Sequence, residues 1–557
     1  MEMMYKRFLE TEKTGPNGEL IDFKWKKLES FNFAYDVVDV IAKETPDKRA
    51  LLWVNDKGEK RNITFSELSE KSDALAAFLM SKGIKKGDKI MLVMKRHYEY
   101  WYSYLALHKI GAVGIPATSQ LLAKDYIYRF ELADVAGIIA TGDGQVAEYI
   151  DEAESHYHPI LKILNKTKRT GWYNFQSAID SAPKFIKPAP DELPKPDDTM
   201  LLYFTSGTTG MPKMVMHDFM YPLGLTPMAL YWHKVVPGGL HITVAETGWA
   251  KAAWGKMYGA WMADCAFFVY DHDRFHAADL LDVITKYKVT TFCAPPTIYR
   301  FMIQEDLTKY DFSHLTHASI AGEALNPEVF NRFYKATGLK PMEGYGQTEL
   351  VLVASTLFYM EPKPGSMGKA VPYLPLDIVD DDGNTVDNGV NGEIVLRCTP
   401  SDKQYGIFKG YYKDEEMTNS VWQNGMYHTG DIAWRDEDGY LWFVSRKDDV
   451  IKSSGYRIGP FEVESVLMEH PAVVECAVTG APDPVRGQVV KATVVLAKGY
   501  EPTEELKKDI QNYVKTHTAP YKYPRIVDFV DSLPKTISSK IRRVEIRESD
   551  KAKSYSD

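Results

Sequence analysis

The residues from Thr205 to Lys213 have the composition of a loop that binds phosphate groups. They read TSGTTGMPK and follow an apolar stretch, residues 201–204, that is typical of a β-strand. Glycines let backbone N–H groups approach a polyphosphate, hydroxyls donate further hydrogen bonds, and a lysine neutralises charge. The candidate ligands are Thr205, Ser206, Gly207, Thr208, Thr209, Gly210 and Lys213. The spacing does not fit a Walker A loop, and a polar surface turn is the alternative interpretation.

Further motifs follow this loop along the chain. They are Gly322-Glu323-Ala324, Tyr345-Gly346-Gln347-Thr348-Glu349, Tyr427-His428-Thr429-Gly430-Asp431, Ser445-Arg446-Lys447-Asp448-Asp449, Lys452-Ser453-Ser454-Gly455-Tyr456-Arg457 and Leu533-Pro534-Lys535-Thr536-Ile537-Ser538-Ser539-Lys540. With these motifs, residues 35–548 closely resemble the adenylate-forming (AMP-forming) superfamily of acyl-CoA synthetases, luciferases and nonribosomal adenylation domains. The chain looks most like the medium-chain acyl-CoA synthetase branch, because of Gly346 and residues 522–525.

The resemblance implies a binding site for ATP. The positions that match the adenine contacts of the family are Gly322, Glu323, Ala324 and Tyr345. An aromatic ring at such a position can stack on the purine. Asp431 matches the carboxylate that accepts both ribose hydroxyls, and Arg446 matches the basic residue beside it. Thr348 and Glu349 match the phosphate and Mg²⁺ contacts, since a magnesium ion bound to ATP prefers hard oxygen ligands such as the Glu349 carboxylate.

The resemblance also implies roles for residues near the C-terminus, in activating the acid and in transferring it to coenzyme A. Lys540 matches the family lysine that reaches the substrate carboxylate and the α-phosphate, where a cation stabilises the meeting of two anions. Ser539 stands where the family usually has glycine. Asp448 matches the hinge about which the small domain swings, and a solvated acidic pair with Asp449 is the alternative. The positions expected to bind coenzyme A are Ser454, Gly455 and Arg457.

The acyl group is expected to lie beside Trp249, Lys251, Trp254 and Gly346. In acetyl-CoA synthetases, which the chain resembles, a tryptophan at the position of Gly346 blocks the acyl pocket. Glycine leaves room for a longer, branched or aromatic acid. The tryptophans could equally be core residues, and Lys251 could pair with a carboxylate or extend its ammonium group to solvent.

The implied reaction has two steps, with Mg²⁺ entering as MgATP and with ATP and coenzyme A as co-substrates. A carboxylate and ATP give acyl-AMP and pyrophosphate, and the thiol of coenzyme A then displaces AMP. We find no G-x-S-x-G nucleophile elbow, so catalysis should rest on positioning and charge stabilisation. One alternative is an adenylating enzyme that loads a carrier protein, although residues 248–251 contain no aspartate for a substrate ammonium group. The other is a non-catalytic nucleotide-binding protein, although Lys540 and Glu349 are both present.

Alternating helix and strand patterns must position these motifs. The spacing predicts a helix capped by Thr64, a strand over 89–94, a helix over 100–110 and a strand over 112–116, which is a βαβ pattern. The same rhythm over residues 277–337 predicts parallel sheets covered by helices. After Gly365, turns at Asp382-Gly383 and Asn391-Gly392 indicate antiparallel hairpins.

We therefore expect an α/β protein with a large N-terminal domain, residues 1–447, and a small mobile α+β domain, residues 448–557, that carries Lys540. The large domain should consist of helix-covered sheets and a β-rich subdomain at about 365–445.

Composition limits the class of protein. The 557 residues carry a net charge of −9, with 45% hydrophobic and 26% charged residues, which excludes disordered, collagen-like and coiled-coil chains. The balance disfavours nucleic acid as a partner. Four cysteines far apart fit a reduced compartment, and no run is apolar enough to span a membrane. We expect a cytoplasmic protein whose partners are a small carboxylic acid, ATP and coenzyme A. The sequence leaves open whether the chain forms a homo-oligomer.

Overall fold

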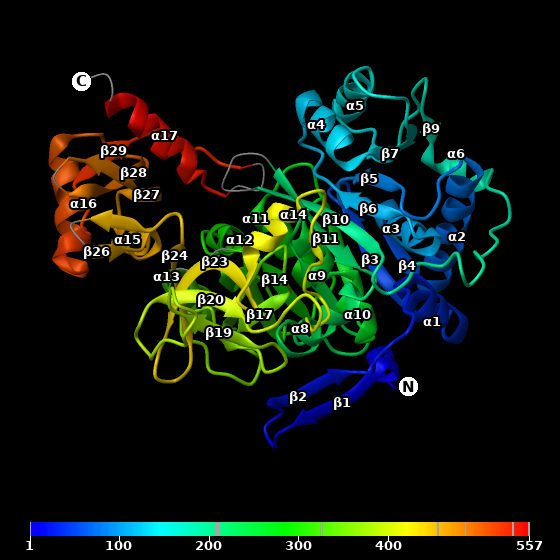
Figure 1. The fold of residues 1–557 in the computed structure, drawn as a ribbon, viewed down its shortest axis with the longest axis horizontal. Coiled ribbons are helices and arrows are strands. Elements are labelled where there is room, and N and C mark those ends of the chain that lie inside the picture. The colour runs from blue at the N-terminus through cyan, green and yellow to red at the C-terminus, as the bar shows by residue number, and fades with distance from the viewer. Residues whose placement is uncertain are drawn as a thin grey trace.

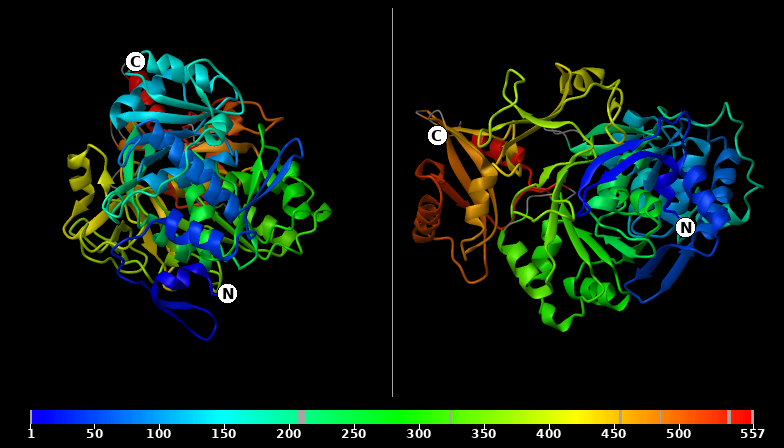
Figure 2. Two further views of the ribbon diagram at one scale, coloured as in Figure 1. Left: turned by 90° about the vertical axis from the view of Figure 1, so that its right-hand side faces the viewer. Right: turned by 90° about the horizontal axis from the view of Figure 1, so that it is seen from below.

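The computed structural model describes residues 2–206, 212–322, 325, 327–453, 456–484, 486–536 and 540–554. A large domain occupies the centre and right of Figure 1, and a smaller one lies at its upper left. Residues 447–450 join the last strand of the large domain to the first strand of the small one. The right-hand view in Figure 2 shows the same division into a large and a small part.

One large sheet carries the strand that leads into the phosphate loop. Within the described residues it has eight strands in the order β21-β11-β10-β6-β5-β7-β8-β9. Their bounds are β5 Lys89–Val93, β6 Val113–Pro116, β7 Val135–Thr141, β8 Leu161–Asn165, β9 Tyr173–Asn174, β10 Thr199–Ser206, β11 Pro212–Asp218 and β21 Gly410–Tyr411. Strands β5 to β8 are parallel, which confirms the predicted βαβ pattern, while β10 and β11 form an antiparallel pair.

The second large sheet carries the adenine and acyl segments expected from the sequence. Its nine strands, counted over the described residues, have the order β18-β17-β16-β15-β14-β12-β13-β3-β4. They are β3 Arg49–Asn55, β4 Lys60–Thr64, β12 Leu240–Thr243, β13 Ala266–Asp271, β14 Thr291–Ala294, β15 His317–Ala321, β16 Pro341–Gly346, β17 Leu352–Ser355 and β18 Lys369–Ala370. Strands β12 to β16 are parallel, as predicted from residues 277–337.

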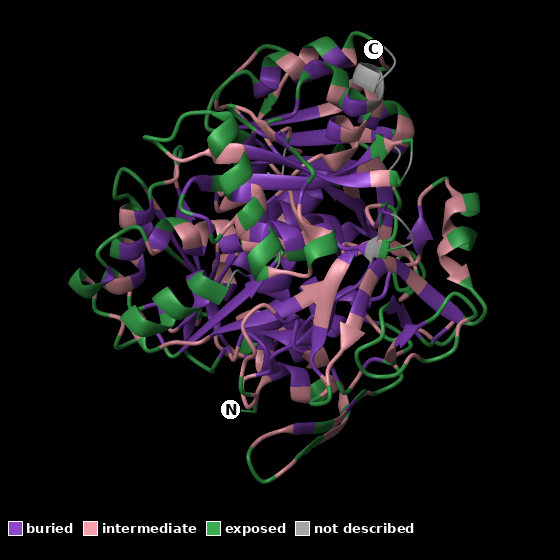
Figure 3. Cartoon of the chain, turned by 90° about the vertical axis from the view of Figure 1, so that its left-hand side faces the viewer, coloured by how far each residue is buried: buried purple, intermediate pink, exposed green. Residues whose placement is uncertain are grey.

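Helix α3, Glu99–Ile110, lies between the two large sheets. Every residue from Tyr100 to Ile110 is buried, which is typical of a helix that is covered on all sides. The ring of Trp101 packs on Phe267 of one sheet, and the Tyr104 hydroxyl lies 3.1 Å from that of Tyr203 in the other. Figure 3 shows the buried strands inside the large domain and exposed residues on its outer helices. The core therefore joins both sheets into one scaffold.

The remaining helices of the large domain surround these sheets. They are η1 Met4–Phe8, η2 Ala34–Asp39, α1 Val40–Glu44, α2 Phe65–Ser81, α4 Ala123–Ala133, α5 Val146–Glu154, α6 Phe175–Asp180, α7 Tyr221–Gly224, α8 Thr226–Tyr231, α9 Ala250–Gly255, α10 Met257–Met262, α11 Ala277–Lys286, α12 Pro296–Met302, η3 Leu307–Lys309, α13 Pro327–Thr337 and α14 Glu415–Val421. Thr64 caps α2 as predicted, since its hydroxyl accepts a hydrogen bond from the Glu67 N–H at 3.2 Å. No helix in the described part of the chain is both long and apolar enough to cross a membrane.

A smaller antiparallel sheet follows the second large sheet. It consists of β19 Leu376–Val379, β20 Gly392–Leu396, β22 Trp422–Gln423, β23 Met426–Arg435 and β24 Leu441–Arg446. The hairpin expectation holds for β19 and β20, which pair antiparallel, but Asn391-Gly392 is not a hairpin turn. Gly392 is the first residue of β20, and a Cβ there would lie 2.5 Å from the Val379 carbonyl oxygen. A close approach of two strands, rather than a turn, therefore requires this glycine.

The C-terminal part has its own sheet and core. Its elements are β25 Ile451–Ser453, β26 Tyr456–Ile458, α15 Pro460–Leu467, β27 Val473–Asp483, β28 Gly487–Leu496, α16 Glu504–His517, η4 Pro520–Lys522, β29 Ile526–Phe529 and α17 Arg543–Ser554. This is the α+β pattern predicted from the sequence. At the other end of the chain, β1 Leu9–Thr14 and β2 Leu20–Trp25 form a hairpin that projects at the bottom of Figure 1.

Candidate functional site

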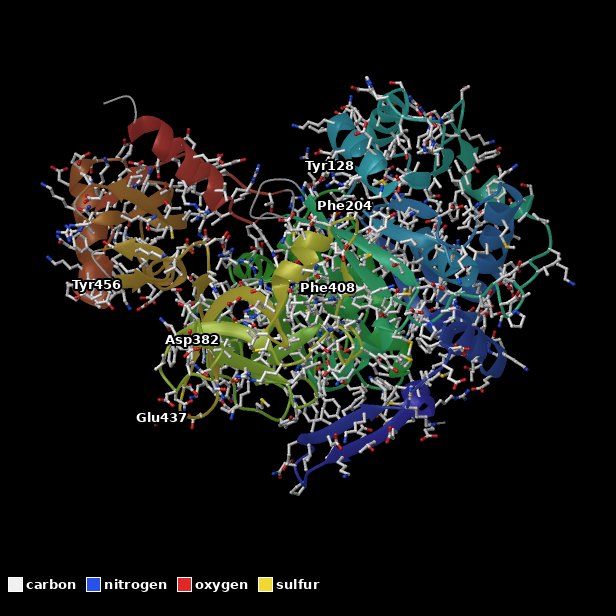
Figure 4. All side chains as sticks on the ribbon, in the orientation of Figure 1. Tyr128, Phe204, Asp382, Phe408, Glu437 and Tyr456 are labelled. Carbon is white, nitrogen blue, oxygen red and sulfur yellow. The ribbon has the colours of Figure 1, made fainter. Side chains whose placement is uncertain are left out.

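Strands β10 and β11 bring the two ends of the predicted phosphate loop together. Thr205 pairs with Lys213 across this hairpin, and the Tyr128 hydroxyl donates a hydrogen bond to the Pro212 carbonyl at 3.0 Å. Figure 4 shows Tyr128 and Phe204 near this end of the sheet. The expected ligands Gly207, Thr208, Thr209 and Gly210 and the side chain of Ser206 lie outside the described residues.

Lys213 faces a carboxylate that comes from a distant part of the chain. Its ammonium group lies 4.8 Å from the centre of the Tyr411 ring, and the Tyr411 hydroxyl donates to Glu349 Oε1 at 2.8 Å. Burial lowers the pKa of Lys213, and the charge of Glu349 partly offsets this effect. The structure thus brings together two of the residues that were predicted to act on phosphate and metal.

The turn that carries Thr348 and Glu349 is fixed from several sides. The Leu350 N–H donates to the Gln347 carbonyl at 3.1 Å, and the Phe408 N–H donates to the Glu349 carbonyl at 2.8 Å. His217 Nε2 donates to the Thr348 carbonyl at 2.7 Å. Glu349 is only 9% exposed, so a preformed backbone holds its carboxylate in place. Carboxylate and hydroxyl oxygens of this kind suit a magnesium ion on a polyphosphate.

Asp431 is the centre of a second polar cluster, formed by β16, β23 and β24. Asp431 and Arg446 are cross-strand partners, and Arg446 Nη1 lies 3.1 Å from Asp431 Oδ1. Tyr345 donates its hydroxyl hydrogen to Asp431 Oδ2, and Gln347 Nε2 donates to the same oxygen at 2.6 Å. Asp431 is 4% exposed, and three residues from two distant segments of the chain therefore contact one buried carboxylate.

The charges in this cluster are mutually stabilising. Burial alone would lower the pKa of Arg446, but the carboxylates of Asp431 and Asp448 outweigh burial and raise it. Burial and the negative charge of Asp431 raise the pKa of Tyr345 well above its usual value. Tyr345 therefore remains a neutral hydroxyl donor beside the carboxylate over the physiological pH range.

Gln347 is a site residue with no role predicted from the sequence, although it belongs to the motif at residues 345–349. Gln347 Nε2 also donates to the Thr429 carbonyl at 2.9 Å, and the Tyr427 hydroxyl donates to Gln347 Oε1 at 3.1 Å. The available signal was spacing, since residues two apart on an extended segment share a face. Gln347 follows Tyr345 by two positions, so both side chains reach Asp431.

The predicted adenine segment begins where β15 ends. Gly322 follows this strand with a φ of 113°, a conformation that favours glycine, while Glu323 and Ala324 lie outside the described residues. The next described residue, Leu325, donates its N–H to Glu343 Oε1 at 3.2 Å. Glu343 lies on β16 and is 5% exposed, and burial raises its pKa to about 8. The neutral carboxyl group of Glu343 therefore holds the adenine segment by accepting the hydrogen bond from Leu325.

The predicted acyl segment forms the start of α9. Trp249 precedes the helix and is half-buried, and Lys251 donates from its ammonium group to the carbonyl of Ala321 at the end of β15. Trp254 is 8% exposed, and its Nε1 donates to the Tyr221 hydroxyl at 2.9 Å. The acyl segment therefore lies directly against the adenine segment.

The surroundings of Gly346 are tighter than its lack of a side chain suggests. A Cβ on Gly346 would lie 2.3 Å from the Val351 carbonyl oxygen and 3.0 Å from Cη2 of Trp254. Glycine at this position therefore leaves less room than the sequence predicted, because Trp254 and the backbone of Val351 lie in the adjacent space. The side chain next to this space is that of Trp254, since Gly346 has none.

The link between the two domains has one anchored residue on each side. Arg446 contacts Asp431 in the large domain, and its Nε lies 3.8 Å from Asp448 Oδ1. Asp449 instead forms ion pairs with Arg543 and Arg547 on α17 of the small domain. Lys447 belongs to the large-domain side, because its ammonium group lies 3.0 Å from Glu393 Oε2 on β20. Asp448 therefore lies between a residue anchored in the large domain and one anchored in the small domain.

Lys540 lies three residues before α17. Its N–H donates to the Thr536 hydroxyl at 3.1 Å, and the Thr536 N–H donates to the Lys540 carbonyl at 2.7 Å. Figures 1 and 2 both show this segment extending from the small domain toward the large one. Lys540 is exposed, and Ser539 lies outside the described residues. The expected coenzyme A residues Ser454 and Gly455, and the side chain of Arg457, also lie outside them.

Comparison with known protein families gives two matches. Residues 38–412 match the family described as AMP-binding enzyme, and residues 462–540 match the AMP-binding enzyme C-terminal domain. The first match alone covers more than half of the chain, and the second lies within its C-terminal part.

Curated relatives resemble the whole chain. The mitochondrial acyl-coenzyme A synthetase ACSM3 of Mus musculus is 40% identical, over 98% of this chain and 96% of that enzyme. The mitochondrial acyl-coenzyme A synthetase ACSM5 of Rattus norvegicus is 42% identical, over 93% of this chain and 90% of that enzyme. Because these relatives are mitochondrial proteins, the expectation of a cytoplasmic protein is wrong.

Solved structures of CoA ligases resemble this chain over most of its length. The anthranilate CoA ligase AuaEII, in complex with anthranoyl-AMP, has a TM-score of 0.85 and 27% identity, covering 95% of this chain and 99% of that one. A benzoate CoA ligase from Burkholderia xenovorans LB400 has a TM-score of 0.81 and 25% identity, covering 93% and 100%. The arrangement of one large and one small domain is therefore shared along the full length.

Proposed function

Because the chain belongs to the AMP-binding enzyme family, we propose that the clusters around Glu349 and Asp431 form one site that activates a carboxylic acid with MgATP. The chain is an AMP-forming acid–thiol ligase, an acyl-CoA synthetase of the medium-chain branch. It converts a medium-chain or aromatic acid to its coenzyme A thioester. The observation that carries the assignment of the site is that Lys213 on β11 and Glu349 in the turn after β16 both contact Tyr411, while Asp431 on β23 pairs with Arg446 on β24. The charge of Glu349 acts on both Lys213 and Arg446, so the two clusters are neighbours.

In the first step, an oxygen of the substrate carboxylate forms a bond to the α-phosphorus of ATP. The bond between this phosphorus and the bridging oxygen of the β-phosphate breaks, and pyrophosphate leaves with the electron pair. Two anions must approach each other, so positioned cations stabilise the transition state more than the ground state. Lys213 neutralises charge on the phosphates, Glu349 and Thr348 would hold the magnesium ion of MgATP, and Lys540 stabilises the negative charge where the carboxylate meets the α-phosphate.

The nucleoside is held by the cluster around Asp431. A buried carboxylate that accepts hydrogen bonds is suited to the two ribose hydroxyls, since charge-assisted hydrogen bonds are stronger than neutral ones. Tyr345, Gln347 and Arg446 orient this carboxylate from three sides. Adenine lies between the Tyr345 ring and the segment that begins at Gly322. Thr205 completes the phosphate contacts at the end of β10.

In the second step, the thiol sulfur of coenzyme A attacks the acyl carbonyl carbon. A carbon–sulfur bond forms, the bond from carbon to the AMP oxygen breaks, and the thiol proton goes to solvent. We assign the contacts with coenzyme A to residues 452–457, and we assign the change between the steps to a hinge at Asp448. The ion pairs support this hinge, since Arg446 is anchored in the large domain and Asp449 in the small one.

The acid binds beside α9, which follows Trp249 and carries Trp254, and Lys251 connects this helix to the adenine segment. Apolar and aromatic walls with few polar groups are typical of sites for such ligands. Because Trp254 and the Val351 backbone limit the room beside Gly346, the site should discriminate among acids by the size and shape of the acyl group.

The experiment that tests this function measures AMP and acyl-CoA with MgATP and coenzyme A. The panel runs from acetate through butyrate, isobutyrate, hexanoate and octanoate to benzoate. Turnover that is greatest beyond acetate supports both the reaction and the acyl site beside Trp254. Turnover with acetate alone would contradict the acyl site, and AMP formation that needs a carrier protein in place of coenzyme A would support the alternative transfer. A chain that binds ATP but forms no AMP with any acid would be a nucleotide-binding protein instead.

The metal dependence gives a second test. Replacing Mg²⁺ with EDTA should abolish pyrophosphate release, and Glu349→Gln should raise the Mg²⁺ concentration needed for half-maximal rate, because an amide is a poorer ligand than a carboxylate. An unchanged magnesium requirement in Glu349→Gln would contradict the role of Glu349.

A further inference from the structure

Tyr221 lies behind the proposed acyl site and contacts the residue that bounds it. It is the first residue of α7 and is 0% exposed. Its hydroxyl accepts a hydrogen bond from Nε1 of Trp254 at 2.9 Å. The far edge of the same indole, Cη2, lies 3.0 Å from the position that a Cβ on Gly346 would take. One end of the Trp254 ring is therefore held by Tyr221, while the other end faces Gly346.

The ring of Tyr221 also connects to the turn that carries Thr348. It packs against the ring of His217, with the ring centres 4.0 Å apart and an angle of 31° between the planes. His217 Nε2 donates to the Thr348 carbonyl at 2.7 Å. Burial lowers the pKa of His217 to about 3, so its ring is neutral and keeps this hydrogen at neutral pH. Because Thr348 follows Gly346 by only two positions, the contacts lead from Tyr221 through Trp254 to Gly346 and back through Thr348 and His217.

A third contact ties Tyr221 to the strand before the phosphate loop. The rings of Tyr203 and Tyr221 lie 6.4 Å apart, and the Tyr203 hydroxyl is 3.1 Å from that of Tyr104. Tyr203 belongs to β10, which leads to Thr205. Buried tyrosine hydroxyls of this kind are usually fully hydrogen-bonded, and such networks specify one arrangement of the side chains.

We propose that Tyr221 is a positioning residue that sets the size of acid the enzyme accepts, by holding the indole of Trp254 against Gly346. Tyr221 acts through Trp254 and does not touch the substrate. This inference rests on the proposed function and deepens it, because it names the group that fixes the wall of the acyl site. It goes beyond the contribution of Trp254 itself, which the resemblance to the family already implies.

The physical reason lies in the short helix that carries Trp254. Helix α9 has six residues, and Lys256 directly after it has a φ of −115° and a ψ of −110°. Trp254 packs in the core, and the hydrogen bond to Tyr221 adds a directional restraint on its ring that apolar packing does not supply. A buried N–H without a partner is costly, and the indole would leave its position to find one. The Tyr221 hydroxyl removes that cost only for the orientation in which the ring faces Gly346.

The test compares Tyr221→Phe with a matched control, Tyr258→Phe. Tyr258 is also 0% exposed, and its hydroxyl pairs with His108 Nε2 at 3.1 Å rather than with Trp254. We expect Tyr221→Phe to raise kcat/KM for octanoate relative to butyrate by about fivefold, the equivalent of one buried hydrogen bond. The KM for ATP should stay at the wild-type value. Tyr258→Phe should keep the wild-type ratio of the two acids.

The same substitution is then made in a Trp254→Phe background, which has no indole N–H. There, Tyr221→Phe should cause no further change in the ratio, since the two substitutions remove the same hydrogen bond. An equal further change in this background would show that Tyr221 does not act through Trp254, and it would overturn the proposal. A merely structural role would change the melting temperature without this dependence on Trp254.

The remaining outcomes separate this inference from the proposed function. A wild-type enzyme that forms thioesters while Tyr221→Phe keeps the wild-type ratio refutes the role of Tyr221 alone. A wild-type protein that forms no thioester from any acid refutes both. Where Tyr221→Phe does not fold, Trp254→Phe removes the donor instead of the acceptor, and an unchanged ratio of octanoate to butyrate in that variant also overturns the proposal.

Discussion

Replacing Gly346 with alanine should damage adenylate formation for every acid, because the added methyl group would meet backbone rather than empty space. Its Cβ would lie 2.3 Å from the Val351 carbonyl oxygen. That peptide would have to move by about 1 Å to reach the ordinary contact distance of 3.4 Å. The turn from Gln347 to Leu350 lies between these two residues and carries Thr348 and Glu349. A displacement of this size in catalytic groups costs about 100-fold in rate.

The assay follows pyrophosphate release with butyrate and with octanoate, and separately follows thioester formation from supplied acyl-AMP. We expect the first rate to fall about 100-fold for both acids and the second to fall less, since phosphate and metal contacts serve the first step. Gly114→Ala is the control, because a Cβ there would approach only side chains, those of Leu201 at 3.3 Å and Leu107 at 3.6 Å, and no backbone. A Gly346→Ala enzyme that keeps its rate with butyrate and loses only octanoate would refute this reasoning and favour a simple filling of the pocket.

Three other predictions concern single groups. Lys540→Ala should lower acyl-AMP formation by roughly 10²–10³-fold, as for other lost charge-stabilising donors, while thioester formation from supplied acyl-AMP stays near the wild-type rate. Equal losses in both half-reactions would contradict its role. Asp431→Asn should raise the KM for ATP by about 10-fold or more, the equivalent of a lost charged hydrogen bond, without changing the KM for the acid. Parallel changes in both constants would instead indicate a general disturbance. Because burial raises the folded-state pKa of Glu343 from 4.5 to about 8, the stability it contributes is lost as pH rises between these values, and urea unfolding should show this loss in the wild type and not in Glu343→Gln. The slope is about 1.4 kcal/mol for each pH unit, and identical pH profiles would show that Glu343 is not buried in its neutral form.

The sequence predicted the scaffold of the site well where the local pattern was strong. The helix capped by Thr64 and the parallel strands between residues 277 and 337 form as predicted, because their apolar spacing and end signals agree. The prediction at Asn391-Gly392 was wrong. That glycine is needed where two strands approach closely, and a dipeptide alone does not distinguish such an approach from a turn.

The prediction of a cytoplasmic location was also wrong, since the relatives that match the chain over nearly its whole length are mitochondrial. Composition and cysteine count describe a folded protein in a reducing environment, and they do not identify the compartment. The domain boundary at residue 448, and the roles of the individual site residues, remain predictions.

The sequence by itself determined which chemical groups are present and the family to which they belong, because ordered motifs such as residues 205–213 and 345–349 keep their residue types and spacing in the linear chain. Only the tertiary structure decided which of these groups meet. Gln347 contacts Asp431 across 84 positions, and Tyr221 contacts Trp254 across 33. The physical reason is that such contacts depend on how two sheets and their helices pack. Local spacing fixes the face of a strand or helix on which a side chain lies, and packing alone fixes what that face touches.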